Sequence, residues 1–336
     1  MTPAELSRTV RHAVRRAVED DALPGPVPDR VEIERPRPGG SGDYATGIAL
    51  RLAGPAGRPP REVAEILRAR VASAPGAEGA VERVEITGPG FLNFTLAPGS
   101  RERPRVGLVR TVLREGRRYG HGDALAGTTA RFAPAAEERA DLWTRTVVAL
   151  LHSQGADADV VPGAAETLRV THAPAGRDLF LRLGPDAARW ALLRPAAHDR
   201  PYTGPELLVQ RESNPLFRVR YAYARARALE RGARQLRLTP GYEGSEPAHT
   251  DLLTALDDHP GVLEAAARLR APDRLARHLE HTAEAFLRFQ ETARPLPLGD
   301  EKPSAAHRSR LALAVAAGAV LAGGLSLLGI DAPEHL

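Results

Sequence analysis

The 336-residue chain contains no cysteine and only one lysine, Lys302. Without cysteine it can form neither a disulfide framework nor a thiolate metal site, and a reducing compartment is the natural expectation. Aromatic residues make up only 4% of the sequence. The hydrophobic and charged fractions, 43% and 26%, are nevertheless those of a globular protein, and the length allows two or three domains.

Several motifs of ligand-binding sites are missing too. No stretch matches G-x-G-x-x-G, G-x-x-x-x-G-K-[ST] or G-x-S-x-G, so neither a nucleotide loop nor a nucleophile elbow is indicated. His278 and His281 lie three residues apart beside two glutamates, but no third ligand is evident, and a solvated helix face is favoured over a metal site. We therefore expect no cofactor and no metal. The opening residues 1–20 lack a long apolar run and predict an amphipathic helix rather than a signal peptide.

Basic charge is supplied almost entirely by arginine and is concentrated in the middle of the chain. Residues 1–100 carry 13 basic and 13 acidic groups, residues 101–240 carry 24 and 15, and residues 241–336 carry 9 and 14. Part of the arginine surplus reflects the composition expected of a GC-rich genome. The concentration in the middle third is suited to a polyanionic partner, with a solvated arginine-rich surface as the alternative.

The charge peaks in residues 214–238, NPLFRVRYAYARARALERGARQLRL, which hold seven arginines and one acid, Glu230. Apolar residues recur at spacings of three and four, which predicts a helix with one buried stripe. Four arginines project on the opposite side and are expected to face solvent and to bind phosphates: Arg220, Arg227, Arg231 and Arg234. A second edge of the helix, beside the stripe, carries Arg218, Tyr221 and Arg225. This combination suits RNA, because arginine binds phosphate and tyrosine stacks on unpaired bases.

The remaining pattern predicts an α+β unit followed by a short α/β piece and a helical bundle. Helices are expected at residues 3–20, 60–73, 104–118, 184–194, 205–238, 247–270, 272–294 and 304–329. Residues 42–53 read as a turn that runs into a helix, and residues 81–97 as two strands interrupted at Gly88-Pro89-Gly90. Residues 128–178 predict strand, helix, strand (ADVV) and strand (TLRVTHA), about one crossover and too little for a doubly wound sheet.

Residues 311–330 form an uncharged, Ala/Gly-rich run that is long enough to span a membrane. Periodicity does not separate a membrane span from a buried core helix. The many small residues favour the core helix, and a tail anchor is the minority alternative.

Several segments resemble arginyl-tRNA synthetases, in the family's own order. NPLFRVRYAYARARAL is similar to the N-P-x-x-Y-V-Q-Y-A-H-A-R segment that opens the DALR-type anticodon-binding domain, and GPDAARWALLR (184–194) to the stretch before it. The last thirty residues resemble the family's final helix and its L-L-G-x-x-x-P-E-x-M ending. GDYATGIAL (42–50) and VEITGPGFLNFTL (84–96) are similar to motifs of the N-terminal tRNA-elbow domain, and LVRTVLREGRRYGHGD (108–123) to the linker that follows.

The two catalytic signatures of the family have no counterpart. In place of the H-x-G-H turn, which holds ATP phosphates at a helix N-terminus, the chain has RFAPAAEERADLWTRT (131–146), without histidine and with two glutamates. The lysine-rich K-M-S-K-S loop is absent, because Lys302 lies far into the C-terminal bundle. About fifty residues stand where the family has a catalytic domain.

The resemblance also implies roles for particular residues. Phe91 and Asn93 occupy positions that contact a D-loop base at the tRNA elbow, while Asp43 and Tyr44 fit a structural turn. Tyr221 and Arg225 occupy positions that meet the anticodon loop. Asn214 and Arg218 are expected to contact RNA at the same site. Four positions depart from the family and put arginine-anticodon specificity in doubt: Arg218 for Tyr, Arg220 for Gln, Tyr223 for His and Leu336 for Met.

The sequence therefore predicts a multi-domain α+β and α protein. It comprises an N-terminal elbow-like α+β domain (1–100), a linker helix with a shrunken α/β, Rossmann-type remnant (101–183), and a DALR-type all-α bundle (184–336). The expected function is non-catalytic binding of tRNA or a tRNA-like RNA at two sites, in the cytoplasm and with a monomer favoured. A regulator that docks on a synthetase or metabolic enzyme is the second interpretation, and residual arginine–tRNA ligase activity the third.

Overall fold

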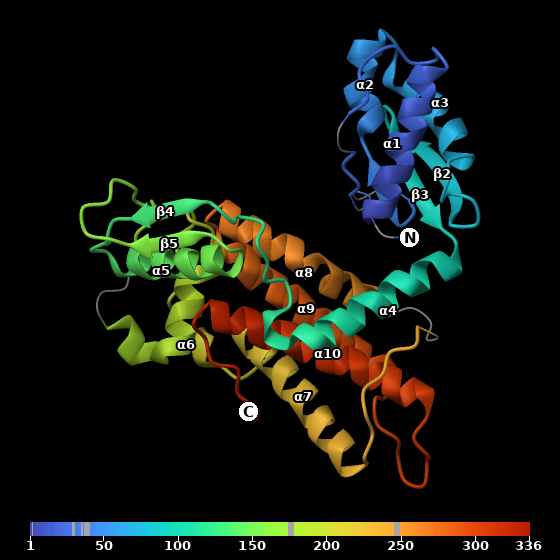
Figure 1. The fold of residues 1–336 in the computed structure, drawn as a ribbon. Coiled ribbons are helices and arrows are strands. Elements are labelled where there is room, and N and C mark those ends of the chain that lie inside the picture. The colour runs from blue at the N-terminus through green and yellow to red at the C-terminus, as the bar shows by residue number, and fades with distance from the viewer. Residues whose placement is uncertain (2, 29–30, 35, 37–40, 174–177, 245–248) are drawn as a thin grey trace. The chain divides into compact units, whose positions relative to one another are not determined.

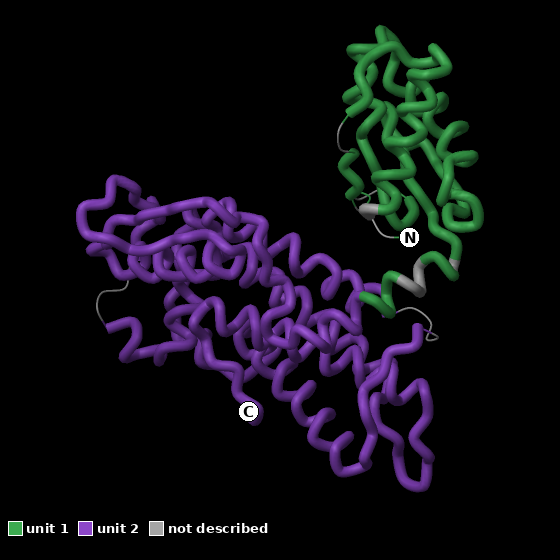
Figure 2. Tube along the Cα trace, in the orientation of Figure 1, with its two compact units in different colours: residues 1–107 green, residues 108–336 purple. Residues whose placement is uncertain are grey.

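The computed structural model describes residues 1, 3–28, 31–34, 36, 41–173, 178–244 and 249–336. The chain divides into two compact units, residues 1–107 and residues 108–336, which Figures 1 and 2 show in ribbon and tube form. Helix α4 (Pro98–Glu115) runs across this division and continues into the 3-10 turn η1 (Gly116–Arg118).

The first unit is a three-stranded antiparallel sheet with three helices. Its elements are α1 (Pro3–Glu19), β1 (Tyr44–Thr46), α2 (Ile48–Ala56), α3 (Pro60–Ala72), β2 (Val81–Thr87) and β3 (Phe91–Leu96). The strand order is β1-β3-β2, and the apolar side chains of α1 and α3 pack with Leu92 and Phe94 of the central strand in one core. The two strands predicted in 81–97 are confirmed. The prediction for 42–53 missed β1, which precedes the helix.

Two glycines in this unit are required by close backbone approach. Gly42 has φ +88°, and a Cβ there would lie 2.6 Å from the carbonyl oxygen of Phe94. Gly90 has φ +147°, and its Cβ would lie 2.8 Å from the carbonyl oxygen of Pro60. Beside Gly42, the carboxylate of Asp43 accepts a hydrogen bond from the Leu96 amide at 2.8 Å. Asp43 thus holds the chain against the end of β3, which is the structural role anticipated for it.

The second unit begins with one parallel crossover. Strands β4 (Thr129–Phe132) and β5 (Asp157–Val160) pair in parallel, and α5 (Glu138–Ser153) connects them. The strand predicted at 167–173 is wrong: these residues form a loop, preceded by a single bridge between Phe132 and Glu166. The backbone of this loop bonds elsewhere, since the Thr171 amide donates to the Ala197 carbonyl and the Thr171 carbonyl accepts from Arg139.

The rest of this unit is a helical bundle, as predicted. It contains α6 (Leu179–Leu193), the 3-10 turn η2 (Pro205–Leu208), α7 (Pro215–Gln235), α8 (Thr250–Arg268), α9 (Pro272–Thr292) and α10 (Ala305–Leu327). The helix expected from residue 205 is wrong in its first part, because only a 3-10 turn forms there and α7 begins at Asn214-Pro215. Asn214 caps the helix with its side chain and Pro215 suits its first position.

Helix α10 lies at the centre of the bundle, in contact with α7, α8 and α9 (Figure 1). It is long and apolar enough to cross a membrane, but 72% of its most apolar window is buried inside the bundle. Small residues permit this packing. A Cβ on Gly323 would lie 2.3 Å from the carbonyl oxygen of Arg117 in η1. This is the core-helix arrangement that the sequence favoured over a tail anchor.

Candidate nucleic-acid interface

The amide side chain of Asn214 is occupied by the cap at the start of α7. Its Oδ1 accepts from the amides of Leu216 and Phe217 at 3.1 and 3.5 Å, and its Nδ2 donates to the carbonyls of Leu207 and Val209 at 2.7 and 3.0 Å. The residue is also buried. Asn214 therefore fixes the loop before α7 and is not placed to contact RNA, contrary to the prediction.

The second predicted edge of α7 is present, and its three side chains differ in what they contact. Arg218 forms an ion pair with Glu284 of α9 at 3.1 Å. Tyr221 is half-buried and stacks on Phe217, with the ring centroids 5.7 Å apart. Arg225 is exposed and has neither an ion pair nor a hydrogen bond with any residue that the structure describes. The edge thus offers one free guanidinium beside an aromatic pair.

The four arginines predicted to face solvent form an arginine ridge that is mostly paired. The exposed fractions of the side chains of Arg220, Arg227 and Arg231 are 26%, 24% and 31%, whereas that of Arg234 is 62%. Arg220 pairs with Asp186 of α6 at 3.4 Å. The prediction of a solvent-facing ridge is therefore wrong for three of the four, because other segments of the chain lie against them.

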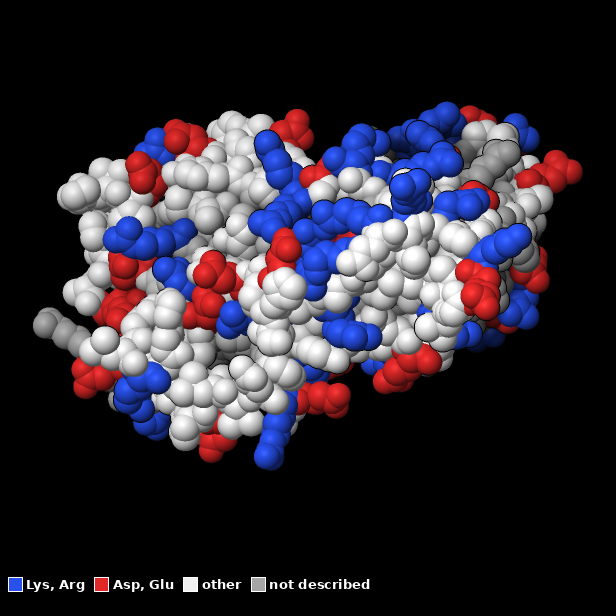
Figure 3. Space-filling view, turned by 90° about the horizontal axis from the view of Figure 1, so that it is seen from below, with Lys and Arg blue, Asp and Glu red and all other residues white. Residues whose placement is uncertain are grey.

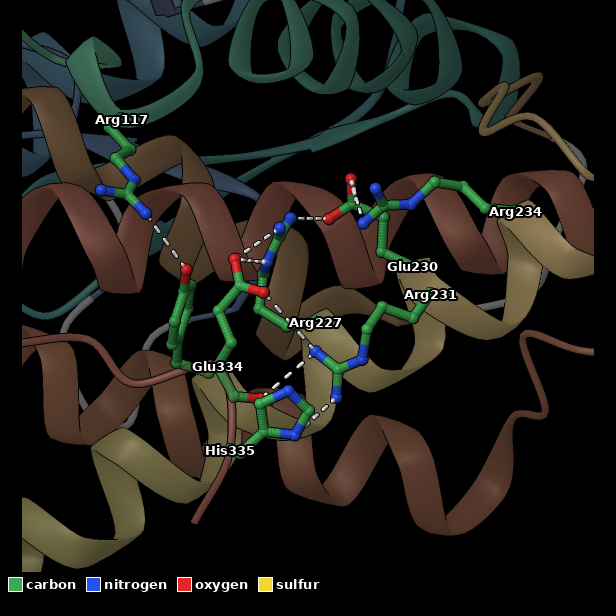
Figure 4. A network of polar contacts seen from close by, with 8 residues as sticks. Arg117, Arg227, Glu230, Arg231, Arg234, Glu334 and His335 are labelled. Carbon is green, nitrogen blue, oxygen red and sulfur yellow. Dashed lines mark hydrogen bonds and ion pairs between the residues drawn. The ribbon is translucent and has the colours of Figure 1, made fainter.

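Two arginines of the ridge, Arg227 and Arg231, are covered by Glu334 and His335. Glu334 accepts hydrogen bonds from Nε and Nη2 of Arg227 at 3.1 and 2.7 Å, and its backbone carbonyl accepts from Arg231 at 3.3 Å. Arg227 also pairs with Glu230 of its own helix. The Glu230 carboxylate lies 3.9 Å from the guanidinium of Arg234. Figure 4 shows Glu334 and His335 against Arg227 and Arg231. The hydrogen bond from Arg227 lowers the pKa of the Glu334 carboxyl.

In Figure 3, Lys and Arg side chains crowd together on parts of the surface drawn. Carboxylates are scattered among them on the same face. The surface is thus basic on balance, and single acidic groups interrupt it. Such a surface attracts a polyanion while leaving particular arginines already paired.

Sequence reasoning missed a hollow of about 300 Å³ at the start of α7. Phe217, Arg220 and Asn214 line it from α7, and Asp186 lines it from α6. The wall is completed by further residues of α6 (183–185 and 187), Leu216, residues 207–210 and Leu336. The sequence feature that marks this place is the Gly184-Pro185 pair. Gly184, with φ 73° and ψ 168°, interrupts α6 beside the hollow. The hollow combines an aromatic ring, apolar side chains and an Arg–Asp pair.

The predicted elbow-like site in the first unit is only partly available. Asn93 is buried, and its Nδ2 donates to Thr87 Oγ1 at 2.7 Å. Phe91 is partly exposed and packs on Gly47, where a Cβ would lie 3.3 Å from its ring. The amide group of Asn93 thus stabilises the turn between β2 and β3, and this placement does not fit the predicted contact to a base. Phe91 is still placed to stack.

At the N-terminus of α5 a carboxylate of the chain itself occupies the place where an anion would bind. Glu137 caps the helix by accepting from the Ala140 amide at 2.7 Å. The same carboxylate lies 3.4 Å from both Nδ1 of His172 and the Ala173 amide. A helix N-terminus attracts anions through its free amides and dipole. Here Glu137 satisfies that preference from within the chain.

Next to this turn, Arg139 is fully buried and joins α5 to the end of α6. Its guanidinium donates five hydrogen bonds of 2.7–3.1 Å to backbone carbonyls, those of Thr171, Leu192, Pro195, Ala196 and Asp199. It also lies 5.3 Å from the centre of the Trp143 ring. A buried arginine with this set of partners is a structural group, and sequence reasoning did not identify it.

Within the described residues, no group of three or more acidic or histidine side chains is arranged to hold a metal ion. His281 is exposed, as expected of a solvated face. His278 is buried, which contradicts that interpretation, and stacks on His259 with ring centroids 5.2 Å apart. His259 in turn stacks on Tyr119, with ring centroids 5.9 Å apart. The three rings form a buried aromatic column between η1, α8 and α9.

Comparison with known proteins agrees with the resemblance noted in the sequence. Residues 4–96 match the model of the arginyl tRNA synthetase N terminal domain, and residues 219–336 match that of the DALR anticodon binding domain. The arginine–tRNA ligase of Frankia alni is 28% identical over an alignment of 560 positions that covers 100% of both chains. This alignment is longer than the present chain, so it includes long stretches in which this chain has no residue.

Two solved structures share the fold. Thermus thermophilus arginyl-tRNA synthetase superposes with a TM-score of 0.67 at 14% identity and covers 100% of both chains. Plasmodium falciparum arginyl-tRNA synthetase superposes with a TM-score of 0.66 at 8% identity and covers 99% of both. At these identities the structures establish the fold, and the two family models add the domains. The chain is thus a relative of the arginyl-tRNA synthetase family, with the family's N-terminal domain and its helical anticodon-binding domain.

Proposed function

We propose that this protein binds tRNA or a tRNA-like RNA without aminoacylating it. The observation that carries the proposal is the edge of α7, where the exposed guanidinium of Arg225, unpaired among the described residues, lies on the same helix as the Phe217–Tyr221 ring pair. A free guanidinium binds phosphate or stacks on a base, and an aromatic ring stacks on an unpaired base. The hollow beside Phe217 and Arg220 adds a recess next to this edge.

The absence of ligase activity is part of the proposal. Adenylate formation needs positive charge directed at the phosphates as charge develops in the transition state. At the α5 N-terminus the present chain has the carboxylate of Glu137, and Lys302 is its only lysine. A carboxylate at that position repels a nucleotide phosphate. These features support a protein that has kept RNA-binding domains and lost adenylate chemistry.

Two sites on one chain raise affinity through effective concentration, even where each contact is modest. In the first unit, Phe91 is the candidate for base stacking, since the Asn93 amide is engaged. Of the changes from the family pattern, Arg218 and Arg220 are both ion-paired. We propose that general RNA affinity is retained while selectivity for arginine anticodons is reduced. A cytoplasmic location goes with this function.

The test is a filter-binding titration with total tRNA at several salt concentrations, together with ATP–pyrophosphate exchange in the presence of arginine. We expect tRNA binding that weakens steeply with salt, because phosphate contacts release counterions. We expect no exchange of pyrophosphate. Absent or salt-independent tRNA binding would contradict the RNA-binding proposal, and arginine-dependent exchange would contradict the loss of catalysis. Crosslinking in the native cell, followed by sequencing of bound RNA, then identifies the ligand.

A second candidate is a protein–protein regulator, favoured by exposed apolar side chains around the hollow. Leu208, Val209 and Leu336 are all exposed at its rim. Clustered apolar side chains on a surface are typical of protein interaction sites. Under this alternative, substitution of the rim leucines abolishes function, whereas substitution of Tyr221 and Arg225 does not.

A further inference from the structure

The segment Asp331–His335, here named the acidic strap, is held to α6 and α7 by polar contacts. At one end, the Asp331 amide donates to the Asp186 carboxylate at 3.1 Å. At the other, Glu334 receives two hydrogen bonds from Arg227 and lies 3.8 Å from Arg231. The His335 ring is 3.4 Å from Arg231. The strap therefore occupies two of the four arginines of the ridge, as Figure 4 shows.

The strap is fastened weakly. Glu334 and His335 are exposed, so their contacts with the ridge are made at the surface in water. Exposed ion pairs contribute little to stability and are screened by salt. A nucleic-acid strand presents a row of phosphates and gains from the release of counterions when it meets arginines. The phosphates of such a strand can therefore displace the single carboxylate of Glu334 from the arginines.

We propose that Glu334 acts as an intramolecular competitor for RNA phosphates. It holds Arg227 and Arg231 in the unbound protein, and a phosphate reaches them only when the strap moves away. Arg225 and the largely exposed Arg234 are accessible before that step and supply the first contacts. This proposal rests on the proposed function, in that α7 is taken to be the surface that meets RNA.

The test compares two glutamine variants that make the same change in net charge. Glu334→Gln removes the carboxylate of the strap. Glu264→Gln removes a comparably exposed carboxylate on α8 that pairs with Arg268 at 3.7 Å. With total tRNA in a filter-binding assay, we expect Glu334→Gln to tighten binding about 3- to 10-fold more than Glu264→Gln, the scale of one added hydrogen bond. The salt dependence should steepen by about one phosphate contact.

If the proposal is correct, the gain in tRNA affinity of Glu334→Gln depends on the arginines of the ridge. In the double variant Glu334→Gln/Arg227→Gln the additional affinity is expected to disappear. Equal effects of Glu334→Gln and Glu264→Gln, or weaker binding by Glu334→Gln, would overturn the proposal. Weaker binding would mean that Glu334 holds the arginines in a productive position.

A second probe, inorganic polyphosphate, separates this proposal from the proposed function. If tRNA binds both variants equally, the strap proposal fails and RNA binding stands. If no variant binds tRNA but Glu334→Gln binds polyphosphate more tightly than Glu264→Gln, RNA binding fails and the competition by Glu334 stands. If neither difference is found with either probe, the competition is refuted irrespective of RNA binding.

Discussion

Arginines that look alike in the sequence differ in whether they are paired. Arg225 is free within the described part of the chain, Arg218 and Arg220 are each held by a carboxylate, and Arg227 is held by two. A paired guanidinium must give up its carboxylate before it binds a phosphate, whereas a free one does not. Accessibility for RNA is therefore decided residue by residue.

Replacing Arg225 should accordingly weaken RNA binding without affecting stability. Arg225→Gln is expected to lower tRNA affinity about tenfold and to reduce the salt dependence by about one phosphate contact. The matched control is Arg268→Gln on α8, an exposed arginine paired only at the surface, with the same change in charge. Equal losses from both substitutions would show that general electrostatic attraction, not a local contact, is responsible.

For Arg139 we predict the opposite: its substitution should have a large effect on stability. Arg139→Met removes a fully buried guanidinium and leaves five carbonyls, that of Leu192 buried and the others partly buried, without their donors, so the free energy of unfolding is expected to fall by about 3–5 kcal/mol. Arg131→Met should have a much smaller effect, because Arg131 pairs with Asp157 at the surface. Urea unfolding followed by circular dichroism measures both. A loss of similar size in the two variants would contradict the structural role of Arg139.

At the scale of elements, two helical glycines allow the effect of close packing on stability to be distinguished from the effect of helix propensity. A Cβ at Gly323 of α10 would meet the Arg117 carbonyl oxygen at 2.3 Å, while one at Gly261 of α8 would meet nothing within 4 Å. Gly323→Ala should destabilise the protein by about 1–3 kcal/mol through overpacking. Gly261→Ala should stabilise it by up to about 1 kcal/mol, since alanine favours a helix. Thermal unfolding of the two variants should therefore move in opposite directions; a parallel shift would refute the close packing of η1 on α10.

An element could be predicted when the residues that cause it lie within its own sequence. The helices α1, α3, α8 and α9 were predicted because each carries an apolar stripe within its own sequence, and α10 because of its long apolar run. The strand predicted at 167–173 failed because an alternating pattern does not show whether a partner strand exists. The start of α7 was misplaced by about ten residues because the apolar residues of η2 extend its pattern, although Asn214-Pro215 is the stronger signal.

At the scale of the second unit, the aromatic column makes stability depend on pH. Burial, with the charges of His278 and His121, lowers the pKa of His259 from 6.5 to about 3. Burial also lowers the pKa of His278 from 6.5 to about 4. Both rings are therefore neutral in the folded protein, while the unfolded chain takes up protons as the pH falls through 6.5. The stability that they contribute is complete above pH 6.5 and is lost as the pH falls towards 3–4.

Urea unfolding between pH 7 and pH 5 tests this dependence above the range in which most carboxylates titrate. The wild-type midpoint should fall steadily over this interval. The variant His259→Phe keeps an aromatic ring between Tyr119 and His278 but has no proton to take up, so its midpoint should fall less steeply. Identical slopes for the two proteins would contradict the lowered pKa of His259.

The sequence by itself determined most of the helices, the concentration of arginine and the absence of lysine-rich and histidine-containing signatures. These depend on the order of residues over one or two helical turns or on composition alone. Only the tertiary structure decided which arginines are free, that Asn93 and Asn214 are engaged internally, and that Arg139 and His278 are buried. The reason is physical: periodicity defines which residues share a face of a helix, but what lies against that face comes from distant segments. Glu334, 107 residues beyond Arg227, is the example.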